Sequence, residues 1–531
     1  MENGRLVGAY FTKDSKLYFV ESKVSIDCTG DADLSAFAGV PFEQGEKRSG
    51  IAINFSKWGI QSISAQTPER RLASKDLGIV DITKITDFQR AMILAHYESS
   101  YYDSYPQLTP RDTRRPFGLK TLELAEALEG KPSADIIAQA SSDYDPHSVP
   151  MNKFARTAMI SPHFPHYYAV NIPFGCIVPK NLNGLLFGGR SISVSHNVLQ
   201  FTRMSGDVAT LGEVEGRIAS DFVKCGGNLA DFDISKIVNE SKKLGYYTDD
   251  YLKRTNLSIT EIIERLARGD SDVLLWACLK SKDEILPMLK NSFSKIRNLQ
   301  TAYALSWFGD NSGEKVILNE IKKNLAQEEK EPQSSNYLEL YWRGNLKSPY
   351  WNINRALAFL AMSGSEKSDK VIAKILENTT SGGAMVRSKD KVYYANRIDL
   401  VLLPNHNRIV NLCFYAERRP SIKFAKGFEK LLADSNISGS STRKYSEGRF
   451  NMNTGLLEML IASASARCGL QKGASVLVHY LGDYQANFRA FAHQELCDIY
   501  KKDFSFDTSK WLSIAKEKSG VVASPLSEKF R

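Results

Sequence analysis

The chain has 531 residues, of which 43% are hydrophobic and 24% charged, with a formal net charge of +9. This length exceeds one ordinary hydrophobic core and predicts two or three domains of a soluble globular protein. No run of about 18 apolar residues is present, so no membrane span is expected. Lys and Arg alternate with Asp and Glu along most of the chain, which predicts a solvated surface and no nucleic-acid binding. No apolar signal segment follows Met1, and the compartment stays open.

The seven cysteines are widely scattered. None forms a CxxC motif, and no His lies at zinc-ligand spacing from a pair of cysteines. This spacing indicates free thiols in place of a disulfide framework. We therefore expect no metal site.

The first stretch of the chain alternates apolar and polar residues in three short runs, at 5–11, 17–22 and 23–27. Alternation with period two predicts three strands of a β-meander. The last of them leads into a Thr-Gly turn, after which a short helix is expected from Asp33 to Gly39.

The middle of the chain contains further elements. Residues 85–102 are typical of a helix, and the apolar run at 184–189 predicts a buried parallel strand that ends in paired glycines. Apolar residues then recur at helical spacing from Val208 to Phe222, and glycines at 226–227 mark the helix end.

After about Tyr251 the pattern becomes helical. Pairs of helical segments, separated by short breaks at Gly or Pro, recur at uneven intervals. This pattern favours a HEAT-like α-solenoid, with an irregular helical bundle as the alternative. We therefore expect an α/β, Rossmann-type region at 1–250 and an all-α region at 251–531.

Two turns follow predicted strands and have the composition of ligand sites. The first turn contains Thr29, Gly30 and Asp31. It lies at the carboxyl end of a strand, where open α/β sheets bind cofactors and where glycine lets backbone N–H groups approach a ligand. A bare Thr-Gly-Asp is also common in ordinary turns. The second turn consists of Gly188, Gly189, Arg190 and Ser191, and it places bare backbone and a cation at a strand end.

The segment after the second turn carries His196 and Arg203 and leads to a helix at Asp207. A helix N-terminus offers free N–H donors and a partial positive charge, which suit a phosphate or an electron-rich flavin edge. Taken as isolated residues, His196 and Arg203 more often have a structural role.

Four sequence blocks together resemble one family. They are "VSIDCTGDADLSAFAGVPFEQG", "PRDTRRPFG", "IPFGCIVPKNLNGLLFGGRSISVSHNVLQFTR" and "ATLGEVEG". In this order, between Arg5 and Asp233, they are similar to blocks of bacterial FAD-dependent oxidoreductases of the glutathione-reductase-like superfamily. The resemblance implies an FAD cofactor and a small-molecule substrate.

The resemblance also implies roles for individual residues. The expected cofactor contacts are Thr29, Gly30, Asp31, Gly188, Gly189, Arg190, Ser191 and Gly212. His196 and Arg203 are the expected catalytic residues, with His196 acting as a general base while hydride passes to the flavin. Arg111, Arg114 and Arg115 match an arginine-rich segment of the family, and they either grip an anionic or polyhydroxylated substrate or form surface ion pairs.

The sequence departs from the family in two respects. Glu213 and Glu215 replace small residues on the helix expected to face the cofactor, so either these glutamates point away or the redox function is altered. The GxGxxG motif that holds the pyrophosphate in such flavoproteins is missing from the sequence.

These observations favour an N-terminally truncated flavin-dependent oxidoreductase that acts on a small organic substrate, with carbohydrate-like molecules among the candidates. The alternative is a non-catalytic scaffold, in which a degenerate flavoprotein region supports a helical solenoid that binds a protein partner. The sequence leaves the substrate, the electron acceptor and the oligomeric state open.

Overall fold

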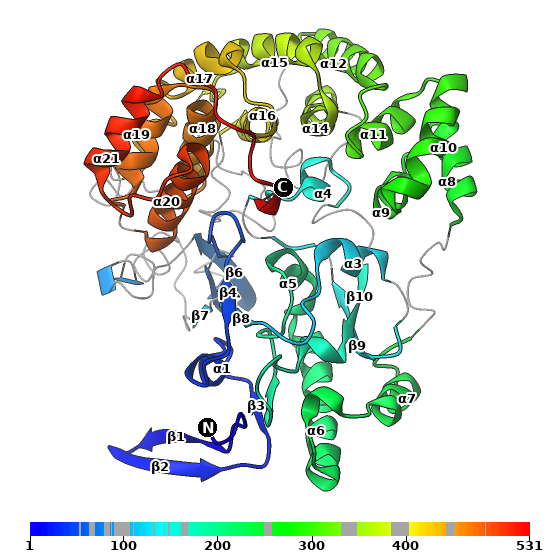
Figure 1. Cartoon of the computed structure of the whole chain (residues 1–531), viewed down its shortest axis with the longest axis vertical. Helices are drawn as coiled ribbons and strands as arrows, with labels where there is room; N and C mark the ends of the chain where they lie inside the picture. The colour runs from blue at the N-terminus through cyan, green and yellow to red at the C-terminus, as the bar shows by residue number, and fades with distance from the viewer. Residues whose placement is uncertain are drawn as a thin grey trace. The chain divides into compact units, whose positions relative to one another are not determined.

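The computed structural model describes residues 1–52, 55–62, 70–78, 85–86, 88–89, 107–109, 111–130, 133–142, 144–146, 149–160, 168–248, 257–330, 348–383, 403–441, 452–483 and 485–530 (Figure 1). The chain forms two compact units. Unit 1 comprises Met1–Lys47, Arg111–Pro146 and Phe164–Thr255, and unit 2 comprises Arg48–Pro110, His147–His163 and Asn256–Arg531.

The described strands of unit 1 pair two by two. Three pairs are antiparallel: β1 (Gly8–Lys13) with β2 (Lys16–Glu21), β4 (Phe42–Gln44) with β8 (Arg114–Pro116), and β9 (Ile136–Ser142) with β10 (Tyr168–Pro173). The fourth pair is parallel and joins β3 (Ser25–Asp27) to β11 (Leu185–Phe187).

The expected meander is therefore wrong in its pairing, although all three of its strands are present. β1 and β2 form a hairpin, whereas β3 leaves it and pairs with β11. The physical reason lies in β11, whose three side chains are completely buried. Such a strand has no polar face and needs a neighbour inside the core, while β2 is exposed along its whole length.

The helices of unit 1 are α1 (Asp33–Phe37), α3 (Leu124–Glu129), α5 (His196–Thr202), α6 (Ser205–Cys225) and α7 (Ser235–Leu244). The predicted helix after residue 208 is confirmed as α6. Leu211, Val214, Ile218 and Phe222 form its buried stripe, and Gly226 ends it with a positive φ of 73°.

Unit 2 contains an antiparallel sheet in the order β6-β5-β7 and an extended series of helices. The strands are β5 (Phe55–Ser62), β6 (Arg70–Gly78) and β7 (Gln107–Thr109). The helices are α4 (Lys153–Arg156), α8 (Ile259–Ala267), α9 (Leu274–Leu279), α10 (Lys282–Lys295), α11 (Leu299–Trp307), α12 (Glu314–Glu328), α14 (Pro349–Ser363), α15 (Glu366–Asn378), α16 (His406–Arg418), α17 (Ala425–Leu431), α18 (Met452–Arg467), α19 (Gln471–Tyr480), α20 (Ala486–Tyr500) and α21 (Thr508–Glu517). Most of the helix predicted at 85–102 lies outside the described residues.

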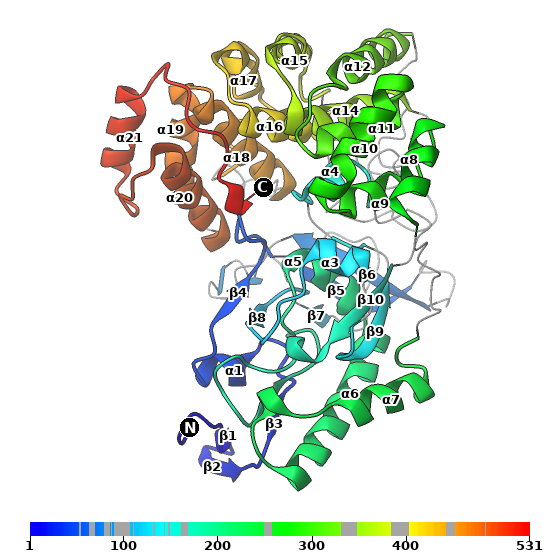
Figure 2. The same ribbon diagram turned by 45° about the vertical axis from the view of Figure 1, so that its right-hand side comes forward.

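The helices of unit 2 pack in two rows (Figure 2). One row runs through α11, α14, α16 and α18, and the other through α12, α15 and α17. Helices of the first row are buried on nearly every side, as the uninterrupted burial of residues 406–417 in α16 shows. The helical character predicted after residue 251 is therefore confirmed. Among the described residues, every helix is too short or too polar to cross a lipid bilayer.

Two segments that precede residue 250 in the chain belong to unit 2, namely 48–110 and 147–163. Their side chains explain this assignment. Phe154 packs against Trp307 in a tilted arrangement, with ring centroids 4.8 Å apart. Arg355 donates a hydrogen bond to the backbone oxygen of Thr157 over 3.0 Å. These contacts give the segment 147–163 partners on the helices, and Arg48 of the segment 48–110 donates hydrogen bonds to Glu417 of α16.

Candidate functional site

The two turns predicted from the sequence lie side by side in unit 1. β3 and β11 run parallel, with Leu185 opposite Ser25 and Phe187 opposite Asp27. Their carboxyl ends therefore meet at one edge of the strand pair. Nη2 of Arg190, in the second turn, lies 3.4 Å from a carboxylate oxygen of Asp31 in the first.

The first turn is held in shape by Asp27, which is 1% exposed. One of its carboxylate oxygens accepts the hydroxyl hydrogen of Thr29 over 2.7 Å. The other accepts from the backbone N–H and the hydroxyl of Ser35, at 2.7 and 2.6 Å. The Thr29 hydroxyl in turn accepts from the N–H of Asp33 at the start of α1. Asp27 thus joins the end of β3 to the beginning of the helix.

The structure requires glycine in the two turns for two different reasons, namely the space available and the backbone conformation. A Cβ added to Gly188 would lie 2.6 Å from the sulfur of Cys28 and 2.8 Å from a carboxylate oxygen of Glu215, so only glycine fits. Gly30 and Gly189 have φ values of +83° and +64°, in the left-handed region that favours glycine. No described atom lies within 4 Å of a Cβ added to Gly189 or Gly212.

Polar atoms without a partner occur at the second turn. Among the described residues, Nε of Arg190 and the hydroxyl of Ser191 are buried without a hydrogen bond. A buried donor that lacks an acceptor costs stability, which a ligand with acceptor atoms relieves. Bare glycine backbone, a guanidinium and a free hydroxyl at the ends of parallel strands fit the ribityl and phosphate groups of a dinucleotide.

His196, the first residue of α5, forms a pair with Asp112. Its Nδ1 lies 2.8 Å from a carboxylate oxygen of Asp112, and both residues are buried. The other carboxylate oxygen of Asp112 accepts a hydrogen bond from Arg115. Next along the chain, the hydroxyl of Thr113 donates to the backbone oxygen of Gly30 over 2.8 Å. The arginine-rich segment therefore contacts both the histidine and the first turn.

The three arginines of this segment have different surroundings. Arg115 is 1% exposed, and its guanidinium donates to Asp112, Glu43 and two backbone oxygens. This arrangement favours a positioning role over contact with a substrate. Arg114 is partly exposed and pairs with Asp33 at 2.8 Å.

Arg111 is buried beside Arg203, because both approach the carboxylate of Asp145. Arg203 donates to a carboxylate oxygen of Asp145 over 2.8 Å, and a nitrogen of Arg111 lies 3.8 Å from the same oxygen. The structure thus brings together one residue predicted as substrate-binding and one predicted as catalytic. Asp145 itself was missed, because nothing in the sequence around it distinguishes it from a loop aspartate.

The two unusual glutamates of α6 point in opposite directions. Glu213 is exposed and pairs with Arg217 at 2.7 Å. Glu215 is completely buried against Gly188, and among the described residues neither of its carboxylate oxygens has a hydrogen-bond partner. Burial raises the pKa of Glu215 well above its usual value. Burial therefore favours the neutral form of this carboxyl group beside the strand ends.

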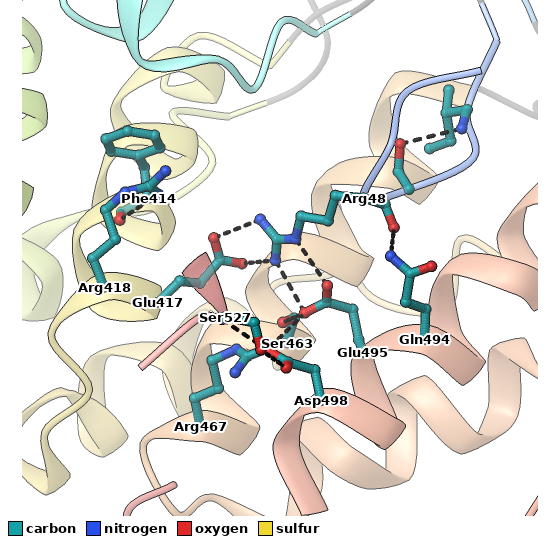
Figure 3. Close-up of polar contacts among 12 residues, drawn as sticks. Arg48, Phe414, Glu417, Arg418, Ser463, Arg467, Gln494, Glu495, Asp498 and Ser527 are labelled. Atoms are coloured by element: carbon teal, nitrogen blue, oxygen red, sulfur yellow. Dashed lines mark hydrogen bonds and ion pairs between the residues drawn. The ribbon is translucent and has the colours of Figure 1, made fainter. Parts of the chain in front are cut away.

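A second polar cluster lies within unit 2 (Figure 3). The guanidinium of Arg48 donates to both oxygens of Glu417 at 2.9 and 2.6 Å, and to both oxygens of Glu495 at 2.8 and 3.0 Å. Arg467 lies on the far side of Glu495, at 3.1 Å, and also binds Asp498 at 2.8 Å. We call these five residues the Arg48 cluster.

The Arg48 cluster is a structural group. Arg48, Glu417, Arg467 and Glu495 are at most 3% exposed. Burial opposes ionisation of Glu495, but the two guanidiniums beside it hold its pKa at about 2. The cluster stays charged because opposite charges face one another.

The paired strand ends, the two glycine turns and the buried His-Asp pair of unit 1 form a candidate cofactor-binding site. Residues 1–57 and 51–240 match the model of a family described as FAD dependent oxidoreductase. Residues 1–240 are therefore similar to FAD-dependent oxidoreductases, and this similarity indicates FAD as the cofactor. No curated protein and no solved structure matches the chain significantly.

Proposed function

We propose that the protein is a flavin-dependent oxidoreductase of the glutathione-reductase-like superfamily, acting on a small organic substrate. The observation that carries the proposal is the convergence of the two predicted turns at the carboxyl ends of β3 and β11. This is the edge at which open α/β sheets bind cofactors. The matched family region contains both turns.

The proposed cofactor contacts come from the two turns. Arg190 and Ser191 supply the buried donors that lack acceptors in the described structure. Gly30 and Gly189 supply backbone that carries no side chain of its own, in a conformation that other residues rarely adopt. Bound FAD supplies a two-electron acceptor for hydride.

His196 is the proposed general base. Its Nδ1 faces the carboxylate of Asp112, which fixes the tautomer with hydrogen on Nδ1 and leaves the lone pair of Nε2 free to take a proton. Arg115 holds Asp112 from the other side. Asp112 and Arg115 are therefore positioning residues in this proposal.

Arg111 and Arg203 are the proposed binders of the substrate's polar end. Their guanidiniums converge on Asp145, so two positive charges stand beside one negative charge. This balance favours an anionic or polyhydroxylated substrate, with a carbohydrate-like molecule as one candidate.

For unit 2 we propose a HEAT-like solenoid that binds a protein partner. The two rows formed by α11, α14, α16 and α18 and by α12, α15 and α17 support this proposal, because stacked helix pairs share one continuous core. The non-catalytic scaffold is the second candidate. Its support is Glu215, a buried polar side chain on the helix packed behind the two turns.

Reconstitution with FAD tests the proposal. The full chain is titrated with FAD while flavin fluorescence is followed, and Arg190→Met is compared with Arg217→Met. Arg217 is an exposed arginine on α6 and serves as the matched control. Loss of one charged hydrogen-bonding group at the cofactor weakens binding by roughly 10- to 100-fold, whereas the control binds as the wild type does. Absence of FAD binding by the wild type favours the scaffold.

His196→Ala tests the catalytic step in the FAD-loaded protein. We expect turnover on an identified substrate to fall by roughly 100-fold or more, with FAD content unchanged. Unchanged turnover would assign His196 a structural role.

A further inference from the structure

α20 carries a histidine and a cysteine one helical turn apart, His493 and Cys497. Residues four apart lie on the same face of a helix. The helix ends at Tyr500. The next residue, Lys501, has a φ of 53° that turns the chain back, and Asp503 follows two residues later. The carboxylate of Asp503 thereby reaches the face that carries the histidine and the cysteine.

Three potential ligand atoms converge at this place. Nε2 of His493 lies 2.9 Å from Oδ1 of Asp503 and 3.4 Å from the sulfur of Cys497. All three atoms lie within 4.8 Å of one another. None of these residues belongs to the Arg48 cluster or to unit 1.

The carboxylate and the sulfur approach the same ring nitrogen. In a nucleophilic cysteine triad, the carboxylate binds one imidazole nitrogen and the thiol the other, so this geometry does not fit such a triad. A neutral imidazole cannot both donate from Nε2 to Asp503 and accept there from the Cys497 thiol. A cation shared by the nitrogen lone pair, a thiolate and a carboxylate satisfies all three groups.

The ligand groups are held in place by their neighbours. Oδ1 of Asp503 accepts the N–H of Ser505 over 2.7 Å. The indole N–H of Trp511, a fully buried residue, donates to the backbone oxygen of Ser505 over 2.8 Å. The ring of His493 packs on Phe506 with centroids 5.3 Å apart. Such supporting contacts orient the ligands of protein metal sites.

We propose that His493, Cys497 and Asp503 bind a Zn²⁺ ion, with water in the fourth position. Sulfur, imidazole and carboxylate ligands together favour Zn²⁺ over Ca²⁺ or Mg²⁺, which select oxygen. Zinc bonds of about 2.0 to 2.3 Å in tetrahedral geometry separate the ligand atoms by roughly 3.3 to 3.8 Å. The sulfur-to-nitrogen separation of 3.4 Å already lies in this range. The nitrogen-to-oxygen separation of 2.9 Å must open, and the side chain of Asp503 is 67% exposed, so it can move.

Metal titration of the full chain, after removal of bound metal, tests the proposal. Zn²⁺ is titrated in competition with a chromophoric chelator, and Co²⁺ is added separately as a spectroscopic probe. We expect about one Zn²⁺ per chain, and a Co²⁺ spectrum with a thiolate charge-transfer band and the intense ligand-field bands of tetrahedral coordination.

Three variants locate the site. Cys497→Ser removes the charge-transfer band, and Asp503→Asn weakens Zn²⁺ binding by at least about tenfold, because losing a ligand costs at least as much as losing a group that supports one. Cys225→Ser is the matched control, since Cys225 is an exposed cysteine on α6, and it leaves both signals unchanged. Because Asp503 is exposed, its variant tests binding even if Cys497→Ser fails to fold. The proposal is overturned if the wild type shows no thiolate band, if the band persists in Cys497→Ser, or if Asp503→Asn binds Zn²⁺ as tightly as the wild type.

Discussion

Replacing Arg48 by methionine will strongly destabilise unit 2. Arg48 is 3% exposed and faces two carboxylates, those of Glu417 and Glu495, that are 0% exposed. Arg48→Met keeps much of the side-chain volume but removes the positive charge. Glu495 keeps Arg467 and the hydroxyl of Ser463, whereas Glu417 loses the guanidinium that binds both of its oxygens.

The expected loss of stability follows from the unpaired carboxylate of Glu417. Removing one partner of a buried ion pair costs about 3 to 5 kcal/mol, because the remaining charge stays in the protein interior without compensation. This loss corresponds to a factor of roughly 100 to 5,000 in the folding equilibrium. Glu417→Gln in the Arg48→Met background removes the stranded charge and should recover part of the loss.

Urea unfolding followed by far-ultraviolet circular dichroism measures the effect, because the helices of unit 2 dominate that signal. The control is Lys423→Met, which removes a surface pair with Glu366 whose two side chains are 37% and 82% exposed. Such a pair contributes less than about 1 kcal/mol. The reasoning is refuted if Arg48→Met costs no more than the control, or if the second substitution recovers nothing.

Three further predictions concern titration and packing. The pKa of Glu495, held at about 2 by Arg48 and Arg467 against an ordinary value of 4.5, stabilises the fold above pH 4.5, and we expect unit 2 to lose this stability as the pH falls from about 4.5 to about 2. Glu215 changes stability in the opposite direction, because burial raises its pKa. Its contribution to the free energy of unfolding is fully present below pH 4.5 and is lost as the pH rises toward the pKa of the folded state. Above pH 4.5, the free energy of unfolding of Glu215→Gln should therefore depend less on pH than that of the wild type. Gly188→Ala should destabilise unit 1 by about 1 to 3 kcal/mol, because the added Cβ would lie less than 3 Å from neighbouring atoms. Gly212→Ala should not destabilise it, because no described atom lies within 4 Å of the added Cβ. Thermal unfolding of the two variants without cofactor measures the difference.

Periodic elements could be predicted from the sequence because their signal is local. The stripe through Leu211, Val214, Ile218 and Phe222 predicted α6 and its buried face. The same helical spacing also indicates which of the two glutamates on α6 is buried. Glu215 stands four residues after Leu211 and three before Ile218, on the buried stripe, while Glu213 falls off it. Which glutamate points inward could therefore have been predicted.

Strand partners could not be predicted in the same way. The alternation of apolar and polar residues around Ser25–Asp27 fits a strand of a meander as well as a strand of a parallel pair. Alternation predicts a strand but does not indicate which strand it pairs with. Only the complete burial of β11, 158 residues after the end of β3, decides the pairing.

The site was predicted in part, for a related reason. Both glycine turns were predicted because turn chemistry is local, and the structure brings them together at the carboxyl ends of β3 and β11. Asp112 and Asp145, which orient His196 and the arginines, lie 84 and 58 residues away from the side chains they contact. Contacts across such separations leave no pattern in a single sequence.

The Arg48 cluster also sets an order of events during biosynthesis. Arg48 is separated by 369 residues from Glu417 and by 447 residues from Glu495. At about 5 to 20 residues per second, a ribosome needs roughly 20 to 90 s to cover the longer interval. The Arg48 guanidinium can bind neither of these carboxylates until Glu417 has been made, and it gains Glu495 only when α20 follows. Unit 2 therefore completes its fold only after α20 has been made, however early its first segments leave the ribosome.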